Sequence, residues 1–343
     1  MQEKPSSATM PNRKWHRFWP WINVGIMVLL ILAGFWLLAV TIGLVNIWNA
    51  LLLANGRFMF LAFCIMVANG LTKAWRWGLL LKSSEQKIPY PPLYWATMLG
   101  QYVNMLLPLF RLGEIARAYA IDTQTQIGKV RALSTMVVEK TLDVIMLGIV
   151  LTIILPFVIL PDSFSQNWGI VALLGTAVLA GLYLLAYQTE FVSRVFVGMT
   201  QWLPDKIRDK LVPLIVSGLE GVSALRSRHT SLLLIGSSAI IQLLAVLTPM
   251  VLFWAFALPL GLTDAALLDS ALTFTAAPPS TPGQIGVFEA TVTVVLSQLG
   301  KFDGAILISY AIVYHLIVLI PKIIFGGLAA LRTNWKWQQS DES

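Results

Sequence analysis

Residues 278–286 read Pro-Pro-Ser-Thr-Pro-Gly-Gln-Ile-Gly and interrupt an otherwise apolar stretch that runs from Ala265 to Leu299. This run cannot continue a helix, because proline lacks the backbone N–H donor and glycine favours turn conformations. Non-helical backbone at membrane depth is tolerated only where protein or water covers it. The stretch therefore predicts two helical limbs joined by a break, which together form a hairpin.

The rest of the chain has the composition of a membrane protein. Its 343 residues are 57% hydrophobic and 12% charged, and the mean hydropathy is +0.74. A soluble domain carries about 25% charged residues. Apolar runs of 18 or more residues indicate spanning helices. Six such crossings are predicted, at 22–45, 58–81, 132–155, 168–187, 231–257 and 305–328.

A second broken segment covers 93–109, where Pro108 is followed by the turn sequence Arg-Leu-Gly-Glu at 111–114. The distribution of basic residues predicts the side from which this segment enters the membrane. Suppose that this segment returns to the side of the membrane from which it entered. The 24 lysines and arginines then all lie on one side of the membrane, except for Arg57, Lys140 and Lys301. Basic residues accumulate on the cytoplasmic side of membrane proteins. We therefore expect a multi-pass protein of the cytoplasmic membrane with both termini cytoplasmic. This hairpin should enter from inside, and 265–299 from outside.

The predicted fold is an all-α polytopic membrane protein with six full transmembrane crossings and two re-entrant helical hairpins in an inverted repeat. Each half has three crossings, so the second half is inserted upside down relative to the first. The whole chain, 1–343, is expected to be one transmembrane domain. Its predicted parts are a cytoplasmic tail (1–20), a first half (21–160), a second half (161–330) and a second cytoplasmic tail (331–343). Within the second half, 190–228 predicts an amphipathic helix on the cytoplasmic surface, with an ordinary polar connector as the alternative.

Arg111, Glu114 and Arg117 are the first candidate binding residues, spaced along one face of a helix that starts after Pro108. Two guanidinium groups and one carboxylate leave a net positive charge, and the planar guanidinium suits a phosphate. The functional hypothesis is a seat for a phosphate or lipid headgroup. The alternative is a cytoplasmic helix cap in which these side chains pair with one another.

Ionisable residues inside predicted crossings form the second set. Glu139 and Asp143 share one face of 132–155, with Lys140 beside them, and they could either pair with arginines or relay a proton. Lys73 and Arg76 lie near the inner end of 58–81. For these two, anchoring at the membrane interface is favoured over headgroup binding.

The break in 265–299 supplies the third set, Pro282, Gly283, Gln284, Gly286 and Glu289. Glu289 follows the break by one helical turn, where the positive end of the helix dipole favours a carboxylate. A single cysteine, Cys64, excludes an intrachain disulfide, and three scattered histidines have no ligand spacing. No catalytic residue, metal site or cofactor is therefore predicted.

Three motifs together resemble a known family. They are Phe110-Arg-Leu-Gly-Glu-Ile-Ala-Arg117, Glu139-Lys-x-x-Asp143 and Pro279-Ser-Thr-Pro-Gly-Gln-Ile-Gly-Val-Phe-Glu289-Ala. In order and spacing they resemble the lysylphosphatidylglycerol synthase transmembrane (flippase-like) family, also called the UPF0104 group. The sequence departs from the family pattern at Phe110 and Gln284, where the family tends to have glycine. Because the chain ends soon after 328, the soluble aminoacyl-transfer domain of bifunctional relatives is not expected.

The resemblance implies a lipid flippase rather than an enzyme, moving a lipid with a polar, phosphate-bearing headgroup of the aminoacylated phospholipid or polyisoprenyl-phosphate type. Two alternatives stay open, a membrane enzyme acting on a lipid phosphate and a non-transporting scaffold for envelope biogenesis. Membrane lipids are the expected partners, and nucleic acid is not. A homodimer and enzymes of envelope-lipid or glycan synthesis are further candidate partners.

Overall fold

A computed structural model describes residues 54–81, 88–107, 112–154, 228–278 and 281–332, together with residues 45, 48 and 52. Every regular element within these ranges is helical. Helices α3 (Gly56–Leu81), α11 (Arg228–Ala255) and α14 (Gly304–Arg332) are long and apolar enough to cross a membrane. They coincide with three predicted crossings. The predicted runs 22–45 and 168–187 and the amphipathic segment 190–228 lie outside the described residues.

A fourth long helix, α6 (Lys129–Ile154), coincides with the predicted crossing 132–155 and has the same length as α3, 26 residues. It differs in carrying Glu139, Lys140 and Asp143 in its interior. These charges exclude it from the helices that qualify as membrane spans by composition. They also mark the place where α6 joins the polar network of the protein.

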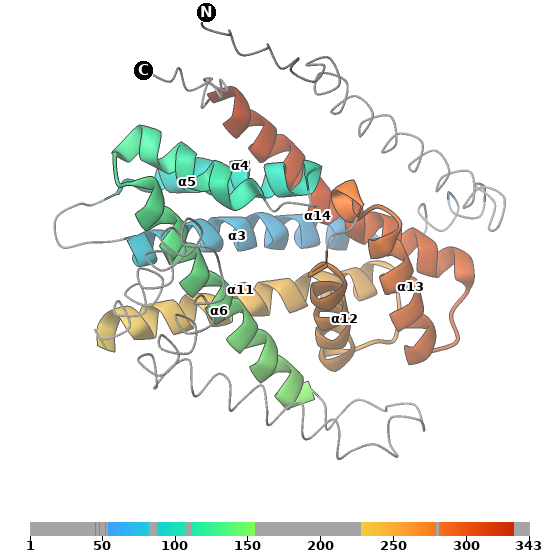
Figure 1. Cartoon of the computed structure of the whole chain (residues 1–343). Coiled ribbons are helices and arrows are strands. Elements are labelled where there is room, and N and C mark those ends of the chain that lie inside the picture. Colours follow the sequence, from blue (N-terminus) through green and yellow to red (C-terminus); the bar gives the residue numbers. More distant parts are fainter. Residues whose placement is uncertain are drawn as a thin grey trace, which may run out of the picture.

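Helices α3 and α11 run antiparallel and form the central pair (Figure 1). The backbone N–H of Asn55 donates to the carbonyl of Ala255 at 2.8 Å, and the side chain of Asn69 donates to the carbonyl of Ile241 at 2.8 Å. As residue numbers rise on α3, those of its partners on α11 fall. The remaining helices pack around this pair.

The first broken segment is an antiparallel helix pair. Helix α4 (Tyr90–Leu106) and α5 (Leu112–Thr125) meet where Gly100 faces Gly113, and Asn104 Oδ1 accepts a 2.8 Å hydrogen bond from the Gly113 N–H. A Cβ placed on Gly113 would collide with the Gly100 carbonyl and with the side chain of Asn104. Glycine at this position therefore permits the close approach of the two limbs.

The second broken segment has the same form. Helix α12 (Leu262–Thr275) and α13 (Val287–Leu299) pack together, and a 3₁₀ turn, η3 (Pro282–Gln284), lies in the connection between them. Gly283, Gln284 and Gly286 all have positive φ, at 65°, 60° and 85°. This confirms the predicted helix break at 278–286, because no helix passes through such backbone angles.

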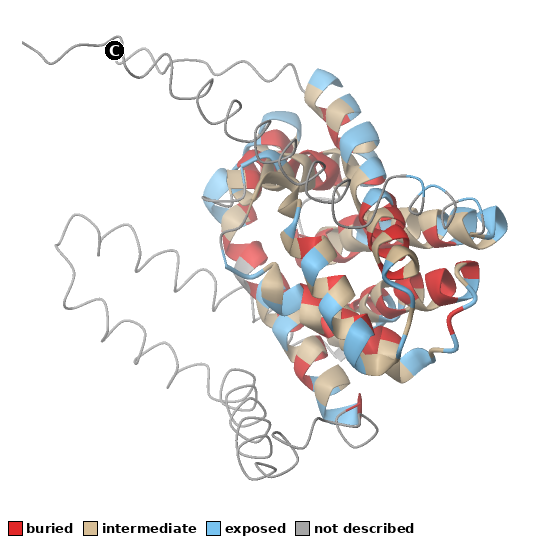
Figure 2. Ribbon diagram, turned by 90° about the vertical axis from the view of Figure 1, so that its right-hand side faces the viewer, coloured by how far each residue is buried: buried red, intermediate tan, exposed pale blue. Residues whose placement is uncertain are grey.

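A long helix, a broken pair and a second long helix thus occur twice, as α3, α4–α5, α6 and as α11, α12–α13, α14. The contacts match as well. Helix α14 packs on α4 just as α6 packs on α12, and η3 reaches α4. Buried residues gather between these elements (Figure 2), and many large apolar side chains of the described residues are exposed. Apolar outer surface is what a lipid environment favours.

Candidate functional site

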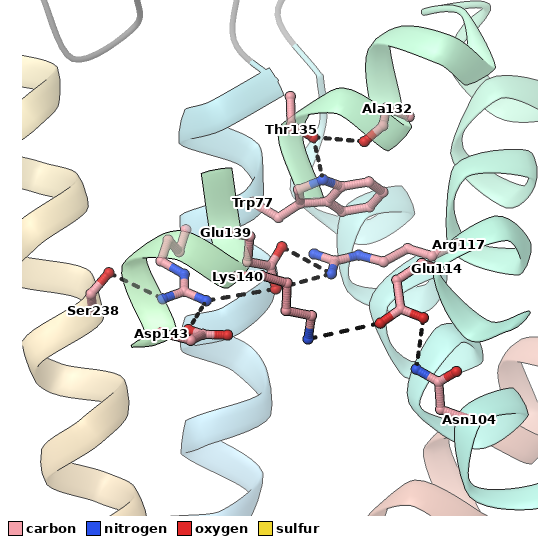
Figure 3. A network of polar contacts seen from close by, with 11 residues as sticks. Trp77, Asn104, Glu114, Arg117, Ala132, Thr135, Glu139, Lys140, Asp143 and Ser238 are labelled. Carbon is pink, nitrogen blue, oxygen red and sulfur yellow. Dashed lines mark hydrogen bonds and ion pairs between the residues drawn. The ribbon is translucent and has the colours of Figure 1, made fainter. Parts of the chain in front are cut away.

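Arg76 on α3 is the centre of an ion network between α3, α6 and α11, and Figure 3 labels its partners Glu139, Asp143 and Ser238. Its side chain is 1% exposed, and one Nη2–H donates to Asp143 Oδ1 at 2.7 Å. Nη1 donates to the hydroxyl of Ser238 at 3.1 Å, and Glu139 Oε1 lies 3.6 Å from Nη2. Short charge-assisted bonds of this kind offset the desolvation of a buried guanidinium. The sequence favoured an interfacial anchor for Arg76, and its complete burial shows that this interpretation was wrong.

Arg117 extends the same network from α5. Its Nη1 lies 3.1 Å from Glu139 Oε1 and 3.0 Å from Glu139 Oε2, and its guanidinium lies 3.8 Å from the centre of the Trp77 ring. The indole N–H of Trp77 donates to the hydroxyl of Thr135 at 3.0 Å. Glu139 therefore sits between two arginines from different helices (Figure 3). One of the two roles left open for Glu139 and Asp143, pairing with arginines, is present in the structure.

Glu114 faces the outer part of this network. Its Oε2 accepts a 3.1 Å hydrogen bond from Asn104 Nδ2, and its Oε1 lies 3.8 Å from Lys140 Nζ. The Lys140 side chain is 54% exposed, so this contact is weak by the standard of surface ion pairs. Arg111, predicted to act with Glu114 and Arg117, lies outside the described residues.

Two lysines lie in spanning helices without an ion pair or hydrogen bond to any described residue. Lys73 on α3 and Lys322 on α14 are partly buried and interact electrostatically with each other. Lys73 also interacts electrostatically with Asp143 and Asp269. Asp269 accepts a hydrogen bond from Gln242 at 2.9 Å. The charge count from the sequence placed Lys322 on the cytoplasmic side with most other basic residues. The structure places it well inside α14.

Both lysines lie one helical turn from glycines that pack against the middle of α4. Lys73 is one turn from Gly70, which contacts the Met98 side chain, and Lys322 is one turn from Gly326, which approaches the Met98 carbonyl. Residues three or four apart share a helix face. The same stretch of α4 bears two buried polar atoms that lack a described partner, Thr97 Oγ1 and Gln101 Nε2. Arg117 Nε and Nη2, on the facing helix α5, also lack one.

In the second hairpin, Glu289 caps its own helix and pairs with α14. Glu289 Oε2 accepts from the Gly286 N–H at 2.7 Å, and Oε1 lies 2.6 Å from His315 Nδ1. His315 Nε2 lies 2.8 Å from the carbonyl oxygen of Gly283. Sequence reasoning missed His315, although an ionisable residue inside the apolar run 305–328 is a signal in its own right.

The remaining predicted residues of the break lie close by. Pro282, Gly283 and Gln284 form η3 and are partly buried, and Gly286 is the residue that Glu289 caps. In the part of the chain that the structure describes, no three His, Cys, Asp or Glu side chains gather as metal ligands. The geometry assembles donors for an anion around α4 and a histidine–carboxylate pair at the second break.

Comparisons with known proteins show the family of the chain. The family model described as "Lysylphosphatidylglycerol synthase TM region" matches residues 23–326. A UPF0104 membrane protein of Methanocaldococcus jannaschii is 31% identical over 119 residues, which is 34% of this chain and 35% of that protein. The alignment thus spans about a third of the relative's length. No solved structure matches the chain. Because the family model covers most of the chain, this membrane protein belongs to the lysylphosphatidylglycerol synthase transmembrane-region family.

Proposed function

We propose that the protein translocates a lipid with an anionic, phosphate-bearing headgroup across the cytoplasmic membrane, and that the headgroup passes beside the middle of α4. The observation that carries this proposal is the group of donors without described partners, on three helices, that surrounds α4. The lipid chains remain in the bilayer during passage. Both termini face the cytoplasm, as the distribution of lysine and arginine indicates.

Helix length supports re-entrance of the two broken segments. Helix α4 has 17 residues, α5 and α12 have 14 each, and α13 has 13. At 1.5 Å per residue, the longest of these limbs extends about 26 Å and the others about 20 Å. The hydrocarbon core is about 30 Å thick. Each limb is therefore suited to entering the membrane and returning, rather than to crossing it.

The repeated order of elements supports a binding site between the halves. Transporters built from inverted repeats bind substrate near the membrane midplane, where broken helices from both halves meet. Here η3 of the second hairpin contacts α4 of the first. Lys73 and Lys322 come from the long helices that precede the first hairpin and follow the second. The donors around α4 thus draw on both halves.

The balance of charge favours an anion as the bound group. Arg76 and Arg117 are neutralised by Glu139 and Asp143, so these four residues hold no net charge. Lys73 and Lys322 have no such neighbours within ion-pair distance among the described residues. A buried donor without an acceptor costs about 1–3 kcal/mol, and a buried unpaired charge costs more. A phosphate would accept from both ammonium groups and from the spare atoms of Gln101 and Arg117.

Lipid that co-purifies with the protein tests this assignment. Native mass spectrometry of the full chain in detergent should detect a bound phosphate-bearing lipid in the wild type. The double variant Lys73→Gln/Lys322→Gln should lose it, because both compensating cations are removed. Arg57→Gln/Lys301→Gln is the matched control, since it removes the same charge from two exposed positions.

Two outcomes would contradict the assignment. One is equal lipid occupancy in the lysine variant and the wild type, and the other is equal loss in the lysine variant and the control. The same spectra also bear on the rival hypothesis of an enzyme. If a lipid phosphate has a changed mass after incubation with the wild-type protein, the result would favour an enzyme that modifies the lipid over a protein that translocates it.

A further inference from the structure

His315 occupies a position where both ring nitrogens face an acceptor. The side chain is 5% exposed, and the ring stacks on Phe288 of α13 with centroids 4.4 Å apart and planes at 12°. Nδ1 lies 2.6 Å from Glu289 Oε1, and Nε2 lies 2.8 Å from the carbonyl oxygen of Gly283. The ring therefore joins α14 to α13 on one edge and to the break on the other.

The number of protons in this group follows from the acceptors. A backbone carbonyl only accepts, so the contact with Gly283 requires a proton on Nε2. The contact between Nδ1 and Glu289 Oε1 requires a second proton, carried by either the nitrogen or the oxygen. A neutral imidazole and a carboxylate together have only one. The arrangement in the structure thus contains one proton more, whether as imidazolium with carboxylate or as imidazole with carboxylic acid.

We infer that His315 and Glu289 form a binding site for one proton, and that this proton holds the break of the second hairpin against α14. The inference stands on the hydrogen-bond geometry and does not require that the transported substance be a lipid. The ligand is H⁺. Its acceptor is the His315–Glu289 pair, and its release returns the pair to a neutral imidazole and a carboxylate.

Release of the proton leaves the ring with one N–H for two acceptors. If Nε2 keeps it, the lone pair of Nδ1 faces a carboxylate oxygen at 2.6 Å. If Nδ1 keeps it, the lone pair of Nε2 faces the Gly283 carbonyl at 2.8 Å. Either arrangement replaces an attraction with a repulsion between two acceptors. Because Glu289 stays bonded to the Gly286 N–H, the pair's link to α14 is the one that weakens.

Few described hydrogen bonds hold the break to the rest of the protein. Within 281–286, the Thr281 hydroxyl donates to the Ile285 carbonyl and the Gln284 N–H donates to the Thr281 carbonyl. Apart from the capping bonds between Gly286 and α13, His315 supplies the only hydrogen bond to these residues from another helix in the described part of the chain. Three residues here have positive φ, including the non-glycine Gln284. A segment with unfavourable backbone angles and a single hydrogen bond to α14 is suited to move away from α14 when that bond is lost.

Other ionisable groups near this pair are accounted for. Glu289 is the only ionisable side chain of α13, η3 has no ionisable side chain, and those of α4 are all tyrosines. On α14, Tyr314 packs edge-on against Phe288, and Lys322 interacts with Lys73 of α3. Asp269 of α12 is hydrogen-bonded to Gln242. Glu289 is thus the only charged group in hydrogen-bonding contact with His315 among the described residues.

Glu289→Gln is a near-isosteric test of the proton count. A glutamine can donate from Nε2 to His315 Nδ1 while its Oε1 still accepts from the Gly286 N–H. The ring then needs only the proton on Nε2, and the link to Gly283 persists without the extra proton. The variant should keep the break in place at every pH. The wild type should release it as the pH rises.

Accessibility of residue 284 measures release of the break. In full-length protein in nanodiscs, with Cys64→Ser as background, Gln284→Cys should react faster with a thiol reagent as the pH rises. Each rate is divided by that of Lys301→Cys, an exposed site that corrects for thiol ionisation. From about pH 5 to about pH 9, which brackets ordinary histidine titration, the ratio should rise several-fold. With Glu289→Gln added it should stay constant. A ratio that is flat in both proteins, or that rises equally in both, would overturn the inference.

Nitrogen NMR measures the proton itself. The chain has three histidines, so ¹⁵N-imidazole labelling gives few signals, and His315→Gln identifies the one that belongs to His315. In the wild type this signal should change with pH, with loss of one proton from the pair. In Glu289→Gln it should remain that of a neutral ring protonated on Nε2. Identical, pH-independent signals in the two proteins would show that the pair binds no extra proton.

Discussion

At the scale of single residues, the charges inside the spanning helices divide into two groups. Arg76, Arg117, Glu139 and Asp143 balance one another's charge, with Ser238 and Trp77 as additional partners, although Arg117 keeps two nitrogens without a described hydrogen-bond partner. These residues connect α3, α5, α6 and α11 and fix their relative positions. Lys73 and Lys322 have no such partners among the described residues. Under the proposed function, the first group mainly holds the structure together, and the two lysines bind the ligand together with the spare nitrogens of Arg117.

Removal of Arg76 should therefore destabilise the protein strongly. Arg76→Leu leaves Asp143 without its 2.7 Å partner and removes one of the two cations beside Glu139. Breaking one side of a fully buried ion pair costs about 3–5 kcal/mol, and the loss here should be smaller because the Asp143 side chain is 38% exposed. The expected result is a lower thermal unfolding temperature of the detergent-solubilised protein, measured by tryptophan fluorescence.

The double variant Arg76→Leu/Asp143→Leu serves as the control, because it removes both members of the pair. It should recover a large part of the lost stability, since replacement of a whole buried pair by apolar residues is often close to neutral. If the double variant were no more stable than Arg76→Leu, the ion pair would not be the source of the effect.

Sequence reasoning located most of these residues but not their partners. Motif spacing singled out Arg117, Glu139, Asp143 and Glu289, because charged residues in apolar runs are conspicuous. It gave Arg76 an interfacial role and passed over His315, since a single sequence does not show which helices touch. The bond from Arg76 to Ser238 joins residues 162 positions apart. Such contacts follow from helix packing, which the local pattern does not determine.

At the scale of elements, the first hairpin depends on close approach of its limbs. Gly100 and Gly113 bring the backbones of α4 and α5 together, and this contact lets Arg117 reach Glu139 past α4. The hairpin breaks themselves were predictable, because Pro108 and the 278–286 run are strong local signals. The glycine contact was not predictable, because its reason lies on the opposite limb.

Gly113→Ala should force the two limbs apart. The added methyl group meets the Gly100 carbonyl and the Asn104 side chain, neither of which has room to move. Overpacking of this kind costs about 1–3 kcal/mol. The expected outcome is reduced thermal stability in the same fluorescence assay, with displacement of α5.

Gly236→Ala is the matched substitution, because a Cβ at this position in α11 meets nothing within 4 Å. Alanine is the better helix former, so this variant should be at least as stable as the wild type. Equal losses in the two variants would mean that the effect at 113 has a cause other than limb contact.

At the scale of the whole molecule, the described helices repeat one order of elements, and helices from both sets contact α4. The order of long helix, broken pair and long helix repeats, and the helix contacts of one half recur in the other. Charge counting and two helix breaks were enough to predict this arrangement of elements within the described ranges. They could not predict where the uncompensated cations would lie, because that depends on how α3 and α14 pack on α4.

The most direct test of lipid translocation uses proteoliposomes that contain acyl-chain-labelled fluorescent phosphatidylglycerol, with dithionite added outside to quench the outer leaflet. Wild-type protein should make labelled lipid of the inner leaflet accessible to dithionite. Lys73→Gln/Lys322→Gln should slow this by about tenfold or more, equivalent to about 1.4 kcal/mol of lost interaction. Arg57→Gln/Lys301→Gln should match the wild type. The central claim would be contradicted if wild-type vesicles behaved like protein-free vesicles, or if the lysine variant translocated lipid as fast as the wild type.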